Sequence, residues 1–172
     1  PEPRENAGRA VAAALAGSRI FLGARRIALY AALPDELPSR PTFEAARAAG
    51  HEVLLPRVAA GRRLVFHPVR AWDELRPGRY GVPEPDAAGV AIAPGPGDLV
   101  LVPGVAFDAA GHRLGRGGGF YDATFPPGAG GPLLVGVGFE LQIVDAVPHA
   151  AHDRSMDAIV TERGLRRCGE ET

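Results

Sequence analysis

The sequence contains no lysine, so all 19 of its basic side chains are arginines, set against 20 acidic ones. The absence of lysine excludes any mechanism that needs a catalytic amine. The formal net charge of -1 gives no reason to expect a nucleic acid or an anionic membrane as a partner.

Cysteine is almost absent, and long apolar runs are missing altogether. The single Cys168 has no second cysteine to pair with, which indicates a reducing cytoplasm. No apolar run approaches the ~18 residues of a membrane-spanning helix, and no secretory signal is visible. The chain begins at Pro1 rather than at methionine, so we expect an N-terminal piece to be missing.

The apolar runs that are present are short and alternate with segments of helical character. ENAGRAVAAALAG (5–17) predicts an alanine-rich helix closed by Gly17. SRPTFEAARAAG (39–50) predicts a second helix, with Ser39 as a candidate N-cap and Gly50 at its end. Strands are predicted at 25–33, 52–58, 63–69, 98–107, 133–139 and 157–164, with a Pro/Gly-rich connection over 76–97. The alternation predicts one α/β domain over 1–172, with helices on the faces of the sheet.

A glycine-rich loop, RLGRGGGFYDATF (113–125), follows the most apolar predicted strand. Glycines let another molecule approach the backbone closely, and successive amides in such a loop can hold an anion. Arg113 and Arg116 add forked donors suited to phosphate, and Asp122 is a possible ligand for a metal that accompanies it. The loop matches neither GxxxxGK[ST] nor GxGxxG. The alternative is a tight turn flanked by two solvated arginines, and the loop sequence alone does not distinguish this turn from an anion-binding loop.

A second cluster, VPHAAHDRSMD (147–157), combines histidines with acids. His149 and His152 form an HxxH pair without a third close nitrogen or thiolate, which is a weak zinc pattern. Magnesium shared by Asp122 and Asp153 is better supported, because Mg²⁺ takes one or two carboxylates together with substrate phosphates.

A third cluster, ALPDELPS (32–39), places Asp35 and Glu36 after an apolar strand. Glu36 could accept hydrogen bonds from a heterocyclic ligand, and a solvated loop is the alternative. Trp72, Tyr80 and Tyr121 are either stacking surfaces or core residues.

Three stretches, in order along the chain, resemble the 5-formyltetrahydrofolate cyclo-ligase (5,10-methenyltetrahydrofolate synthetase) family. LVLVPGVAFDAAGHRLGRGGGFYD is similar to the central signature of that family, and VGVGFELQIVDAVPHAAHDRSMDAIVTE to its C-terminal block. IALYAALPDEL and the later YGVPEP match more loosely. Together the stretches cover most of residues 26–162.

The resemblance implies a single-domain three-layer α/β sandwich with a mostly parallel sheet, similar to the sugar-phosphate isomerase and CoA-transferase-like group. It implies an enzyme that uses ATP and Mg²⁺ to convert 5-formyltetrahydrofolate into 5,10-methenyltetrahydrofolate, ADP and phosphate, by way of a phosphorylated formyl group. We expect a cytoplasmic monomer that binds neither nucleic acid nor membrane.

The resemblance also implies roles for individual residues. Arg116 and Tyr121 are expected to be catalytic, and Asp122 and Asp153 to be the magnesium ligands. The expected ATP contacts are Arg113, Leu114, Gly115, Arg116, Gly117, Gly118, Gly119, Phe120 and Tyr121. The expected folate contacts are Ala31, Glu36, Tyr80, Arg116, Gly117, Gly118, Gly119 and Phe120.

The chain departs from the family pattern in two places. The family carries an N-terminal helix with a lysine and an arginine that reach ATP, and we expect this chain to start too late to contain it. Arg4 and Arg9 are not expected to replace those cations. Gly118 stands where some members carry lysine, which removes one more positive group. Tyr80 matches an aromatic position of the family that is tryptophan in some members. A nucleotide- or anion-binding module without turnover, and a sugar-phosphate isomerase, remain the rival functions.

Overall fold

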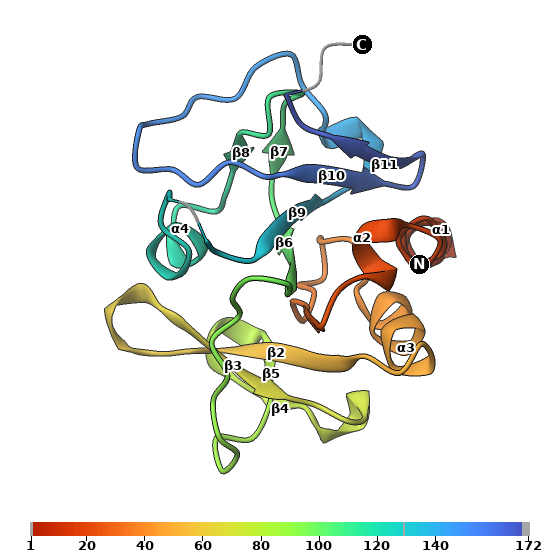
Figure 1. The fold of residues 1–172 in the computed structure, drawn as a ribbon, viewed down its shortest axis with the longest axis vertical. Helices are drawn as coiled ribbons and strands as arrows, with labels where there is room; N and C mark the ends of the chain where they lie inside the picture. Colours follow the sequence, from red (N-terminus) through yellow and green to blue (C-terminus); the bar gives the residue numbers. More distant parts are fainter. Residues whose placement is uncertain (1, 129, 170–172) are drawn as a thin grey trace.

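A seven-stranded sheet runs through the computed structural model, which describes residues 2–128 and 130–169 (Figure 1). In spatial order the strands are β11 (Gly164–Arg167), β10 (Ala158–Thr161), β9 (Leu133–Val137), β6 (Leu99–Pro103), β1 (Arg26–Ala28), β2 (Glu52–Val58) and β3 (Leu64–Pro68). The strands from β10 to β2 are parallel, and the two edge strands are antiparallel. The mostly parallel α/β architecture predicted from the sequence is confirmed.

Three helices cover one face of the sheet: α1 (Glu2–Ala16), α2 (Arg19–Leu22) and α3 (Arg40–Ala48). Val11 and Leu15 of α1 and Phe43 of α3 are buried in one cluster with alternate residues of the strands, such as Ile27 and Leu99. Alternate strand residues point to opposite faces, so this face is formed by every second position of the apolar runs.

The opposite face has a thinner cover, made of short elements and loops. Ala28, Leu54 and Val100 pack there with Phe107 and Phe125. Phe107 belongs to a two-stranded hairpin, β7 (Ala106–Phe107) and β8 (Arg113–Leu114), and Phe125 follows the short helix α4 (Phe120–Thr124). Two layers around the sheet are therefore present, but one of them contains only a single short helix among the described residues.

Several of the predicted strands are shorter in the structure, most clearly those predicted at 98–107 and 25–33. The run 98–107 is divided at Gly104, where β6 ends and the chain turns into β7. A Cβ at Gly104 would lie 2.6 Å from the Phe107 ring, so this turn needs glycine. The run 25–33 forms a strand only as far as Ala28, although its next residues remain buried.

Ser39 precedes α3 as predicted, but its side chain does not cap the helix. The Ser39 hydroxyl donates instead to the carbonyl oxygen of Tyr30, 2.5 Å away. This hydrogen bond ties the start of α3 to the segment that follows β1.

The 76–97 connection contains the small hairpin β4 (Arg76–Pro77) and β5 (Pro83–Glu84). Single 3₁₀ turns occur at Ala60–Arg62 (η1), Trp72–Glu74 (η2), Arg79–Gly81 (η3) and Glu140–Gln142 (η4). None of the helices described is long and apolar enough to cross a membrane.

The order of the strands creates a switch point between β1 and β6. From β1 the chain moves through α3 to β2 on one side, and the later parallel strands lie on the other. The pairing of β1 with β6 covers only Ile27 with Leu99 and Ala28 with Val100. Beyond this pairing the two chains part at their carboxyl ends, where open α/β sheets bind their ligands.

Candidate active site

A cavity of about 910 Å³ opens where β1 and β6 separate. Tyr30 and Ala31 line it after β1, Pro103 and Gly104 line it at the end of β6, and Pro56 belongs to the part of β2 that extends beyond β1. Every site residue implied by the family resemblance lines this one cavity: Ala31, Glu36, Tyr80, Arg113, Leu114, Gly115, Arg116, Gly117, Gly118, Gly119, Phe120, Tyr121, Asp122 and Asp153.

The glycine loop forms one wall of the cavity. Gly117 and Gly119 have φ angles of 83° and 64°, a left-handed conformation that side chains disfavour. Gly119 is also the N-cap of α4, so the last residues of the loop form a short helix. The glycines are thus required to turn the chain from β8 into α4 along the cavity.

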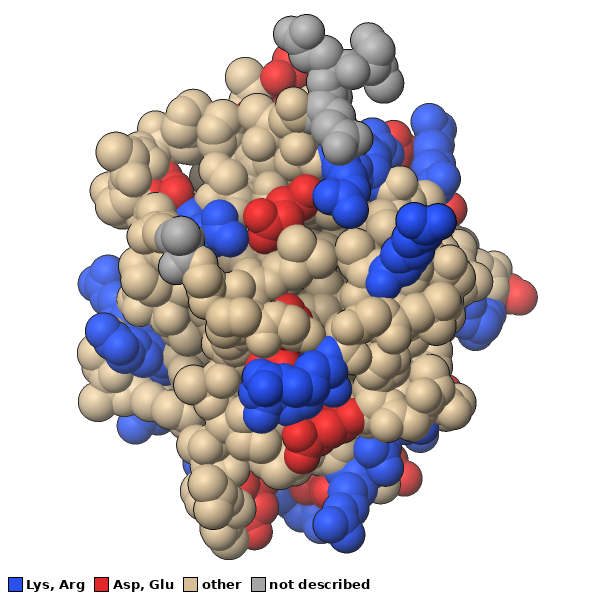
Figure 2. Space-filling view, in the orientation of Figure 1, with Lys and Arg blue, Asp and Glu red and all other residues tan. Residues whose placement is uncertain are grey.

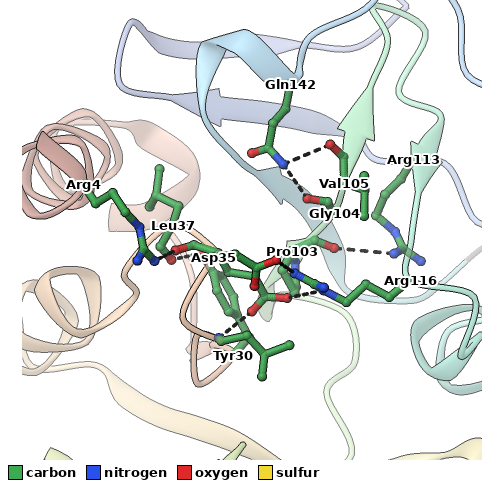
Figure 3. A network of polar contacts seen from close by, with 12 residues as sticks. Arg4, Tyr30, Asp35, Leu37, Pro103, Gly104, Val105, Arg113, Arg116 and Gln142 are labelled. Carbon is green, nitrogen blue, oxygen red and sulfur yellow. Dashed lines mark hydrogen bonds and ion pairs between the residues drawn. The ribbon is translucent and has the colours of Figure 1, made fainter. Parts of the chain in front are cut away.

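Arg116 extends from the glycine loop to the acidic segment after β1 (Figure 3). Its guanidinium lies 2.5 Å from Asp35 and 3.5 Å from Glu36. The hydrogen bond between them raises the pKa of Arg116 and lowers that of Asp35. This arginine is therefore paired with acids, and the charge that the sequence suggested for phosphate is already compensated.

Arg113 has a different environment, although it belongs to the same loop. Its side chain is only 8% exposed, with Nη2 3.2 Å from an Asp122 oxygen and Nη1 3.4 Å from the Pro103 carbonyl oxygen. Its guanidinium also lies 5.6 Å from the centre of the Tyr121 ring. The contacts of Arg113 are with the protein itself, which makes it a support for Asp122.

The two expected metal ligands lie on the same wall. The backbone amide of Arg154 donates to Asp122 Oδ1 over 3.2 Å, which brings Asp153, the preceding residue, close to Asp122. Asp153 accepts a hydrogen bond from the Ala150 amide and lies 3.4 Å from His152. Two acidic residues that are distant in the sequence thus line the same cavity.

Glu36 is held from three sides. One carboxylate oxygen accepts the Leu33 amide at 2.9 Å, and the other faces Arg116. The Glu36 carbonyl oxygen accepts a hydrogen bond from Arg4 of α1. The solvated-loop alternative does not hold for Glu36, because its side chain is only 13% exposed.

The aromatic candidates divide into two groups. Tyr80 is 74% exposed at the cavity, with an unusual φ of 58°, and its ring meets that of Phe120 edge-on at 6.2 Å. Burial raises the pKa of Tyr121 well above its usual range, so its phenol stays protonated. Trp72 packs against Phe43 and does not line the cavity, so it is a core residue.

A scan against family models matches residues 1–162 to the 5-formyltetrahydrofolate cyclo-ligase family. The chain belongs to this family of enzymes. The 5-formyltetrahydrofolate cyclo-ligase of Mycolicibacterium smegmatis is 31% identical over 169 residues, which cover 94% of this chain and 86% of the relative. That of Escherichia coli K12 is 31% identical over 168 residues, which cover 94% and 91%.

Solved structures of the family have the same fold. The 5,10-methenyltetrahydrofolate synthetase of Aquifex aeolicus superposes with a TM-score of 0.83 at 32% identity, covering 99% of this chain and 86% of that one. The synthetase of Mycoplasma pneumoniae superposes with a TM-score of 0.70 at 19% identity, covering 94% and 88%, and supports the fold alone. The resemblance found in the sequence is confirmed.

The sequence analysis did not identify several residues of this cyclo-ligase cavity. Arg62, at the tip of the β2–β3 hairpin, lines it with a φ of 57°. Glu84 also lines it and is buried, accepting the Val58 amide and facing Arg57 at 3.7 Å. Glu84 lies within the quoted YGVPEP stretch, but no pattern in the sequence distinguishes Arg62 from a solvated hairpin arginine.

The histidine pair considered for zinc is separated in this family member. His149 stacks on His112 with ring centres 3.5 Å apart, whereas His152 lies at the cavity beside Asp153. Among residues 2–128 and 130–169, no three histidine, cysteine or acidic side chains lie close enough to hold a metal by themselves. A cation at Asp122 and Asp153 therefore needs further ligands from a bound molecule.

Proposed function

We propose that this chain converts 5-formyltetrahydrofolate into 5,10-methenyltetrahydrofolate with consumption of ATP and release of ADP and phosphate. One observation carries the proposal beyond family membership. Three segments that are far apart in the sequence bring a glycine loop, two carboxylates and a buried glutamate to one cavity. Phosphate binding, cation binding and recognition of a heterocycle can therefore take place side by side.

The chemistry begins with a formamide oxygen, which is a poor leaving group. Transfer of the γ-phosphoryl group from ATP to this oxygen gives an iminium phosphate and ADP. The neighbouring N10 of the folate then attacks the formyl carbon, and phosphate leaves with the oxygen while N10 gives up its proton. Such transfers depend mainly on positioning and charge neutralisation, which suits a cavity without a Ser or Cys nucleophile among its described lining residues.

Each proposed role follows from a position in the cavity. Residues 113–121 cover the phosphates, and Arg116 neutralises charge on the transferred phosphoryl group. Glu36, with Ala31 and Tyr80, contacts the pterin, where a carboxylate can accept ring N–H groups. Tyr121, protonated because of its burial, can donate but cannot act as a base.

Magnesium fits the residues present. Mg²⁺ usually keeps one or two carboxylates together with phosphate oxygens and water, and Asp122 and Asp153 supply two carboxylates at the cavity wall. When bound, the ion would neutralise negative charge on the nucleotide. The two acids would hold it only together with ATP, in keeping with the small number of protein ligands.

A direct assay tests the proposal. With Mg²⁺, ATP and 5-formyltetrahydrofolate, purified protein should release ADP and methenyltetrahydrofolate in equal amounts. ATP consumption should be slow without the folate, because water is poorly positioned to replace the formyl oxygen. 10-Formyltetrahydrofolate should not turn over, since its formyl group already occupies the attacking nitrogen. ATP binding without product would favour the binding module, and conversion of a sugar phosphate without ATP the isomerase.

A further inference from the structure

Gln142 lies outside the cavity lining, yet its side chain is fully engaged close to it. It belongs to η4, the single turn that follows β9. Its Nε2 donates to the carbonyl oxygens of Gly104 and Val105 at 2.9 and 3.0 Å (Figure 3). Its Oε1 accepts the Phe139 amide at 2.7 Å. One side chain thus joins the carboxyl ends of β6 and β9.

The turn that Gln142 holds is also the one against which Arg113 packs. A Cβ on Gly104 would lie 2.9 Å from Arg113 Cγ, which shows how closely the arginine stem passes this glycine. Pro103, immediately before the turn, accepts a hydrogen bond from the Arg113 guanidinium. The Val105 amide donates to the Leu114 carbonyl oxygen at 2.7 Å and so fixes the residue next to Arg113.

Arg113 in turn contacts Asp122, with 3.2 Å between Nη2 and Oδ2. Its side chain is 8% exposed and has little room to reorient. The position of the carboxylate therefore depends on the position of the arginine, and the position of the arginine on the turn at 103–105.

We propose that Gln142 is a positioning residue: by fixing the 103–105 turn it seats Arg113 and so sets the Asp122 carboxylate for the cation that accompanies the nucleotide. The inference rests on the proposed function for the identity of the ligand. In this inference Gln142 influences the cation site although it contacts neither the substrate nor the metal. Partners that orient a metal ligand typically affect metal affinity about 10- to 100-fold when they are removed.

The test compares Gln142→Met with Leu141→Ala by calorimetric titration with Mn²⁺ and a non-hydrolysable ATP analogue. Methionine has a similar length and no donor, whereas Leu141 lies on the same turn and is 84% exposed. We expect Gln142→Met to weaken Mn²⁺ affinity about tenfold, to raise the Mg²⁺ concentration needed for half-maximal turnover similarly, and to leave the KM for folate unchanged. Leu141→Ala should match the parent protein.

A double-mutant cycle separates positioning from general damage. In an Asp122→Asn background, Gln142→Met should cause no further loss of Mn²⁺ affinity, because the carboxylate through which it acts is gone. Full additivity of the two losses, or equal losses in metal and folate binding, would overturn the inference. The titration needs no turnover, so an inactive protein that still binds Mn²⁺ and nucleotide would contradict the proposed function and leave this test intact.

Discussion

Two aspartates at opposite ends of β6 show how one residue type can serve stability or chemistry. Asp98, directly before β6, has a fully buried carboxylate that accepts hydrogen bonds from Arg25, Arg26 and the Gly95 amide. Asp122, at the cavity beyond the other end, is 24% exposed and accepts from Arg113 and the Arg154 amide. Asp98 is saturated by the protein, whereas Asp122 still faces a space that a ligand can fill.

The hydrogen bonds that Asp98 accepts also determine its pKa. Burial alone would raise the pKa of Asp98, but the hydrogen bonds from Arg26, Arg25 and Gly95 outweigh it and lower the pKa to about 2. A carboxylate paired this fully has no capacity left for a cation. Both ends of β6 contain arginine and aspartate, so the presence of charge does not show which aspartate is structural. The number of protein donors that each carboxylate already accepts from is the better guide.

The arginines give the sharpest test of this contrast. Arg116→Ala and Arg25→Ala each remove an arginine from an aspartate, one at the cavity and one at the far end of the sheet. We expect Arg116→Ala to lower kcat on the order of 10²–10³-fold, the usual cost of losing one preorganised charge stabiliser. Arg25→Ala should leave kcat close to that of the parent protein. Steady-state kinetics measure both, and equal small losses would count against the role given to Arg116.

The aspartates themselves give the next largest effect. Asp122→Asn should raise the Mg²⁺ concentration needed for half-maximal turnover about tenfold or more, because an amide cannot supply the charge of a carboxylate. Asp98→Asn should leave the Mg²⁺ requirement unchanged. A magnesium titration of turnover checks this, and an unchanged requirement in Asp122→Asn would remove the acid from the cation site.

Acid should expose the stabilising role of Asp98. Its pKa of about 2 in the folded protein lies below its usual 3.8. The stabilisation is therefore complete above about pH 5 and is lost as the pH falls toward 2, a total of about 2 kcal/mol. Urea unfolding of the parent protein and of Asp98→Asn at pH 6 and pH 3 should show their free energies of unfolding converging at the lower pH. A constant difference would contradict the assignment.

The smallest effect separates the two arginines around Asp98. Arg25 is 61% exposed and Arg26 only 19%. Water can replace part of what the exposed Arg25 guanidinium donates to Asp98, so Arg25→Ala should lower the free energy of unfolding by on the order of 1 kcal/mol, and Arg26→Ala by clearly more. Thermal and urea unfolding of the two variants measure the difference, and the reverse order would show that exposure does not govern these pairs.

Much of the fold and of the site could be predicted from local patterns. The buried strands could be located from their apolar runs, and the loop at 113–125 from its glycines and arginines. Asp122 and Asp153 could be paired through the ligand preference of Mg²⁺ and through the resemblance, although nothing local brings segments 147–157 and 113–125 together. The division of the run 98–107 at Gly104 was missed, since a continuous apolar stretch does not show where the Phe107 ring will pack.

Contacts between distant segments could not be predicted. Arg113 and Arg116 look equivalent in the sequence, yet one is buried against Asp122 and the other pairs with Asp35, 81 positions away. On the face shown in Figure 2, basic and acidic side chains are interspersed, so composition gives no hint of which arginine meets which acid. Burial and partners depend on the assembled sheet, and these decide what each arginine does.

The pair between Arg116 and Asp35 gives this arginine a counter-ion within the protein itself. An anion that binds Arg116 replaces Asp35 and draws the guanidinium away from Glu36, so binding is an exchange of anions. The free-energy gain is the difference between two ion pairs, and the dependence of affinity on ionic strength is correspondingly shallow. Under the proposed function, the same exchange would free the Glu36 oxygen that faced the arginine, so that phosphate binding would leave this oxygen available to the heterocycle.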